Sequence, residues 1–260
     1  MTDALAFESV RVRTIRSTAW LVGLALVLGA LVALALALAT RDEGLDADLV
    51  AVGVTGGSQF SPLPFAAVLV GILGVFATGH EFRHGTVQPT LLALPRRSVL
   101  VAAKLLVVAA VGAVTAVAGL LLNWLVTVGS RGEIVGLPSA EVLIGYVLFV
   151  VLWGLLGAGL ALLFRNIPGA LVVLLVVPLV VEPLISGLSF VPALSGLRDV
   201  VPYLPFTAGT SLVSVVDVGA AAEAAGAPET LGRWEGGAVF ASVVALVLAA
   251  AWGLFERRDA

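Results

Sequence analysis

The stretch GHEFRHGT, residues 79–86, carries the side chains with the clearest chemistry in the chain. His80, Glu81 and His84 spell H-E-x-x-H, and no other histidine occurs among the 260 residues. Histidines four positions apart share one helix face and can bind zinc, while the glutamate between them serves as a general base. The string therefore raises the question of zinc-dependent peptide hydrolysis, which the surrounding elements would have to support.

The composition places these residues in a membrane protein. Hydrophobic residues make up 60% of the chain and charged residues 12%, whereas soluble domains carry about one quarter charged residues. The mean hydropathy is +1.13. The length allows several spans with their connections but no separate soluble catalytic domain. The chain contains no cysteine, which excludes disulfides, cysteine nucleophiles and thiolate metal sites.

Six apolar runs are long enough to cross a bilayer, for which about 20 helical residues are needed. We predict an all-α integral membrane protein whose single transmembrane domain covers residues 1–260. The predicted spans are 18–40, 62–79, 105–128, 142–164, 167–185 and 236–255. Pro178 and Pro183 favour a kink in the fifth span. Segment 4–16 is basic and has partly helical apolar spacing, which predicts a helix on the inner membrane surface, although its V-R-V-R also fits a strand.

The basic residues predict the orientation of the spans. Ten of the 14 lysines and arginines fall in the N-terminus, the segments 79–104 and 165–168, and the C-terminus, and the opposite segments hold the remaining four. Because cytoplasmic segments carry the excess of positive charge, we expect both termini in the cytoplasm. The H-E-x-x-H string then lies at the cytoplasmic end of the second span.

A zinc site at that depth requires a third protein ligand. Glu182 lies about 21 Å along a helix that starts on the cytoplasmic side, near the wrong face. Glu8 and Glu256 lie on the right side, but no second motif marks either one as a ligand. We therefore predict no metal, and an intramembrane zinc protease that uses His80, Glu81 and His84 remains an alternative.

The residues after the first histidine form a second pattern, E-F-R-H-G-T followed by Thr-Leu, Pro-x-Arg and Ala-Lys. It resembles the cytoplasmic loop of permease subunits of the second, export-type class of ATP-binding cassette (ABC) transporters. A run at 203–209, YLPFTAG, is similar to one that these permeases carry between their fifth and sixth spans. The matching loop positions are Glu81, Phe82, Arg83, Gly85, Thr86, Thr90, Leu91, Pro95, Arg97, Ala103 and Lys104.

The resemblance implies a coupling helix in the loop 80–104 that docks into an ATPase subunit, and short outer helices within the segment 186–235. The residues themselves fit, since Gly85 can break the helix that leaves the membrane and Thr86 can cap a new one. A loop that only joins two spans is the plainer alternative. The residues expected to couple to the ATPase are Glu81, Arg83, Gly85, Thr86, Thr90, Leu91 and Pro95.

The chain has no nucleotide-binding motor of its own. Lys104 is its single lysine, and its surroundings do not form G-x-x-x-x-G-K-[ST], the phosphate-binding loop. We expect no enzymatic activity and no cofactor in this chain, with ATP and Mg on a separate ABC ATPase subunit. The resemblance also implies a second permease copy or a homologous permease. An ion-coupled carrier or channel, which would place ionisable groups at mid-membrane, is the alternative from another class.

A few polar residues interrupt the apolar spans and could line a pathway. Thr115, Asn123 and Thr127 share one face of the third span, and Glu182 lies in the fifth. Hydrogen bonding between helices explains them equally well. A route poor in charge favours an amphipathic or lipophilic cargo, such as a drug, antibiotic, peptide or lipid. We expect the chain to act in a bacterial cytoplasmic membrane, surrounded by lipid and without a nucleic-acid partner.

Overall fold

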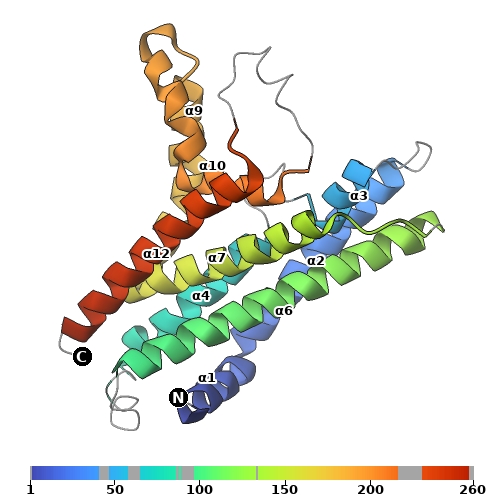
Figure 1. Cartoon of the computed structure of the whole chain (residues 1–260). Coiled ribbons are helices and arrows are strands. Elements are labelled where there is room, and N and C mark those ends of the chain that lie inside the picture. Colours follow the sequence, from blue (N-terminus) through green and yellow to red (C-terminus); the bar gives the residue numbers. More distant parts are fainter. Residues whose placement is uncertain are drawn as a thin grey trace.

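The computed structural model describes residues 2–40, 47–57, 65–85, 88, 97–132, 134–215 and 230–257, with the backbone alone at His84. These residues form helices and no strand (Figure 1). The α-helices are α1 (Thr2–Thr14), α2 (Arg16–Ala39), α3 (Ala47–Val54), α4 (Phe65–His84), α6 (Arg97–Arg131), α7 (Ala140–Phe164), α8 (Ile167–Val176), α9 (Glu182–Leu188), α10 (Pro205–Thr210) and α12 (Arg233–Arg257).

Six of the described stretches are long and apolar enough to cross a membrane, as the sequence predicts. They are α2, α4, α6, α7, the run from α8 through α9, and α12. Two of them extend beyond their apolar runs. α4 continues to His84 and α6 begins at Arg97, so the loop between them is shorter than the predicted segment 80–104. Backbone hydrogen bonds hold a helix together whether its side chains are apolar or charged. Hydropathy therefore underestimates the length of both helices.

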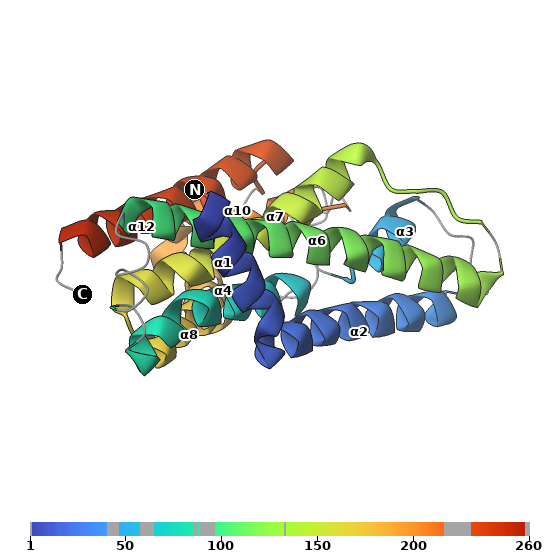
Figure 2. The same ribbon diagram turned by 90° about the horizontal axis from the view of Figure 1, so that it is seen from below.

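The N-terminal segment is a helix and not a strand. α1 covers most of the predicted segment 4–16 and is separated from α2 by Ile15, whose backbone is extended (φ −78°, ψ 114°). Figure 2 shows α1 crossing the ends of α4 and α6. Its apolar and charged residues share a helical period, so Ala4, Glu8 and Val12 are buried together at spacings of four.

The fifth span is irregular where the prolines predict it. After α8 the helix widens into a π-helical turn, η1 (Val177–Val181), before α9 begins. Pro178 lacks a backbone N–H, and such a turn accommodates the lost hydrogen bond. Short helices η2 (Pro192–Asp199), η3 (Val201–Tyr203), α10 and η4 (Ser211–Val213) follow this span.

The centre of the bundle is a close contact between α4 and α7. A Cβ atom built on Gly74 would lie 2.1 Å from the carbonyl oxygen of Gly154, and one built on Gly157 would lie 2.0 Å from that of Gly71. Small residues of this kind let helix backbones approach each other within a membrane. Beside this contact, Phe149, Trp153, Phe206 and Phe240 form an aromatic cluster that joins α7 to α10 and α12.

Gly157→Ala is expected to destabilise the chain by about 1–3 kcal/mol or more, because the new methyl group collides with backbone that cannot move aside. Thermal unfolding of the detergent-solubilised protein measures the effect. Gly253→Ala in α12 is the matched control, since a Cβ there meets no atom within 4 Å. Equal unfolding temperatures for the two variants would contradict the close packing of α4 on α7.

Candidate functional site

Four charged side chains from three helices meet where α1 crosses α4 and α6. Lys104 Nζ of α6 donates to Glu8 Oε1 of α1 at 2.7 Å and to Glu81 Oε1 of α4 at 2.5 Å. Arg11 of α1 donates to Glu81 Oε1 and to the carbonyl oxygen of Ala77. Its Nη2 also lies 2.8 Å from Glu8 Oε2. Each carboxylate therefore contacts both cations, and we refer to Glu8, Arg11, Glu81 and Lys104 as the charge ring.

The charge ring is electrically neutral, and three of its members are buried while Arg11 is partly buried. Glu8 is 1% exposed, Lys104 5% and Glu81 6%. Two carboxylates and two cations balance each other, which matters because an unpaired buried charge costs several kcal/mol. Glu8 and Arg11 lie three residues apart and so share one face of α1, while Glu81 and Lys104 bring α4 and α6 to that face.

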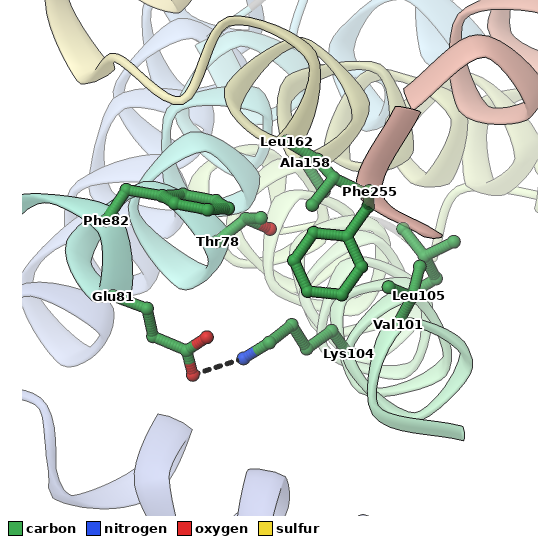
Figure 3. A pocket seen from close by; sticks show the side chains of 9 residues that line it. All are labelled: Thr78, Glu81, Phe82, Val101, Lys104, Leu105, Ala158, Leu162 and Phe255. Atoms are coloured by element: carbon green, nitrogen blue, oxygen red, sulfur yellow. Dashed lines mark hydrogen bonds and ion pairs between the residues drawn. The ribbon is translucent and has the colours of Figure 1, made fainter. Parts of the chain in front are cut away.

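The space beside the ring is too small for a substrate. A cavity of about 10 Å³ separates Glu81 and Lys104 from Thr78, Phe82, Leu105 and further apolar side chains. Figure 3 shows the Glu81 carboxylate directed at the Lys104 ammonium group at the edge of this cavity. Such a volume holds about one water molecule at most. The contacts that the ring makes are contacts between helices.

The charge ring lies next to the loop that carries the E-F-R-H-G-T pattern. Glu81 is in the last turn of α4, and α4 ends at Gly85, whose φ of +65° is the left-handed conformation that ends many helices. Arg83 is exposed. Thr86, Thr90, Leu91 and Pro95, together with the predicted coupling helix, lie outside the described residues.

The far end of the same loop is held as well. α6 starts at Arg97, whose Nη1 donates to the carbonyl oxygen of Phe255 in α12 at 3.3 Å. Lys104 lies seven residues later, about two helical turns. The Glu81–Lys104 ion pair thus joins the two helices that flank the loop, and a hydrogen bond attaches the start of α6 to α12.

Two residues of the H-E-x-x-H string, His80 and Glu81, contact different neighbours. The His80 ring stacks on Phe76 with ring centroids 5.0 Å apart, whereas the Glu81 carboxylate is bound by Arg11 and Lys104. Within the described residues, which exclude the side chain of His84, no three side chains of the metal-binding types come together. A general base needs a carboxylate oxygen beside the metal-bound water, and in this structure Glu81 is bound to cations.

The three polar residues predicted for the third span are buried on one face of α6. Thr115 and Thr127 donate to carbonyl oxygens of their own helix, those of Val111 and Asn123. Asn123 Nδ2 donates at 2.9 Å to the carbonyl oxygen of Val54 in α3. Asn123 thus forms a hydrogen bond between helices, which is the alternative to lining a pathway.

Glu182 connects the fifth span to α10. Its Oε1 accepts a hydrogen bond from the backbone N–H of Phe206 at 2.8 Å. Its Oε2 accepts from the backbone N–H of Thr207 at 2.7 Å and from the Thr207 hydroxyl at 2.8 Å. The carboxylate thereby satisfies the first free N–H groups of α10, and it lines a cavity described below.

Reasoning from the sequence identified Glu81 but missed Glu8, Arg11 and Lys104 as its partners. One signal was present, because a lysine inside an apolar run needs a counter-charge in the membrane. Its position could not identify that partner, since Glu8 lies 96 residues away along the chain.

Comparison of the sequence with known proteins yields no match to any family model and none to a curated protein.

Lys104→Met is expected to destabilise the chain by about 3–5 kcal/mol, because it leaves Glu8 and Glu81 buried with one cation between them. Thermal unfolding in detergent measures this effect, with Arg13→Met on the exposed side of α1 as the matched control. The double variant Lys104→Met, Glu8→Gln is again neutral and should recover most of the loss. If it recovers none, charge balance is not what holds these helices together.

Proposed function

We propose that this chain is the transmembrane permease subunit of an ABC exporter, with the loop 85–96 and both termini in the cytoplasm. The observation that carries the proposal is the charge ring, which joins the two helices that flank this loop. The E-F-R-H-G-T pattern, which resembles that of export-type permeases, begins in the last turn of α4 and continues into this loop. Six apolar helices support the same proposal.

The ring gives the loop a mechanical connection to the spans. Glu81 lies four residues before Gly85, and Lys104 lies seven residues after Arg97. Pulling Glu81 or Lys104 out of the charge ring would leave that buried charge without a partner, at a cost of about 3–5 kcal/mol. The ends of α4, α6 and α1 therefore move together when a bound subunit pushes on the loop, and α2 follows through Ile15.

A partner must supply the energy. Because the chain lacks a phosphate-binding loop, ATP and Mg belong to a separate ATPase subunit, and a second permease copy or a homologue completes the transporter. In this arrangement α1 lies on the inner membrane surface, where its exposed Phe7 and Val10 reach the acyl chains and exposed Arg13 and Arg16 reach anionic headgroups. The short helices η2, η3, α10 and η4 face the outside.

The cargo class follows from the charge content of the spans. Outside the charge ring, the apolar helices carry few ionisable groups, and Glu182 is the carboxylate buried in the fifth of them. Strongly charged solutes need several such groups along a route. We therefore propose an amphipathic or lipophilic cargo, and a bacterial cytoplasmic membrane as the location.

The test is co-purification from gently solubilised native membranes. The tagged chain should bring down a stoichiometric ATPase, and Gly85→Arg should reduce the amount recovered by about tenfold, a loss of about 1.4 kcal/mol of binding. An arginine cannot adopt the left-handed backbone at residue 85 without strain, and its bulk would obstruct docking.

Gly132→Arg is the matched control. Gly132 follows the other end of α6, has a φ of +73° and has open space around it, so its replacement brings the same strain away from the loop. Equal recovery of the ATPase with both variants would show that the loop 85–96 does not bind the ATPase. Stoichiometric zinc in the eluate without an ATPase would favour the protease instead, and gradient-driven transport without ATP would favour a carrier.

A further inference from the structure

A cavity of about 300 Å³ lies between the irregular fifth span and α10. Its size is at the lower end of the range of small-molecule sites, about 300–1,000 Å³. The fifth span contributes Pro178, Glu182 and Ser186 to its wall, and α10 contributes Phe206, Thr207 and Thr210. π-Helical turns such as η1, which ends directly before Glu182, often occur at functional sites.

Glu182 differs from the other two buried carboxylates of the described chain. Glu8 and Glu81 each contact two cations. Glu182 is 3% exposed, and its partners are two backbone N–H groups and one hydroxyl, all neutral. No lysine, arginine or histidine among the described residues forms an ion pair with it. Hydrogen-bond donors at both oxygens suit the ionised carboxylate, and a buried charge normally has a counter-ion.

The other wall residues fit an organic cation. Phe206 offers an aromatic ring, which attracts ammonium groups. Ser186 and Thr210 offer hydroxyl oxygens, and Pro178 offers an apolar surface for the hydrocarbon part of a ligand. The cavity thus combines one negative charge, an aromatic ring and apolar surface within the volume of a small amine.

We infer that this cavity is a subsite for the positively charged amine group of an amphipathic cargo. The inference rests on the proposed export function and narrows its cargo to organic cations. In the proposed orientation Glu182 lies in the outer half of the fifth span, so the subsite receives the amine late in its passage. The ligand's charge then takes the place of the counter-ion that the chain does not supply.

The test uses two probes of the same shape, phenyltrimethylammonium and its neutral carbon isostere tert-butylbenzene. Equilibrium dialysis of the purified full chain in nanodiscs, against empty nanodiscs, measures the binding of each probe. The cation should bind about tenfold more tightly than its isostere. Binding of the cation no tighter than that of the isostere overturns the inference.

Variants assign the binding to the cavity. Ser186→Phe fills the cavity from the fifth span without touching the hydrogen bonds of Glu182, and should weaken binding of the cation by about tenfold. Ser242→Phe, at an exposed position of α12, is the matched control and should bind as the parent chain does. Thr210→Leu fills the cavity from α10, and it replaces Ser186→Phe in the test if that variant does not fold. Parental affinity in a folded cavity-filled variant also overturns the inference.

Glu182→Gln tests the charge itself. It should remove the preference for the cation over the isostere, and a preserved preference would show that another group provides the negative charge. Because these binding measurements need no ATPase, they test the subsite independently of the proposed export function. If an ATPase co-purifies but the cation does not bind, the subsite is wrong and the exporter proposal stands. If the cation binds but no ATPase co-purifies, the exporter proposal is wrong.

Discussion

A buried charge in an apolar protein needs an opposite charge or hydrogen-bond donors beside it, and ion pairing of this kind joins three helices in the N-terminal half of the chain. Lys104 lies in the apolar α6 and can be accommodated there only with carboxylates beside it. Glu81 supplies one from α4, and Glu8 supplies the other from α1. Arg11 then balances the second carboxylate. The position of α1 across the bundle is thus set by electrostatics as much as by its apolar residues.

The rest of the molecule divides into a closely packed part and an irregular part. Glycines bring the backbones of α4 and α7 into contact, so the helix that carries Glu81 is fixed against the centre of the bundle. The fifth span instead contains prolines and a π-helical turn, and the Glu182 carboxylate ties it to α10 through hydrogen bonds from uncharged backbone donors. The two regions use carboxylates differently, one to join helices through cations and the other to cap a short helix beside a cavity.

The H-E-x-x-H string shows why a short pattern does not define a site. Its spacing requires that the two histidines share a helix face, but it does not determine which neighbours each side chain meets. His80 stacks on Phe76, and Glu81 is occupied by two cations from other helices. These cations come from α1 and α6, which the string does not include.

The sequence by itself left the N-terminal segment between a helix and a strand, but it determined the six apolar helices, the break at Gly85 and the irregular fifth span. Each of these follows from residue type and local spacing, since hydrocarbon thickness, backbone φ and the missing N–H of proline act within a few residues. Only the tertiary structure decided that Glu8, Arg11, Glu81 and Lys104 form one ring, that Asn123 bonds to α3 and that Glu182 caps α10. The contacts between different helices join residues 23 to 96 positions apart, and which charge meets which depends on how the helices pack against one another.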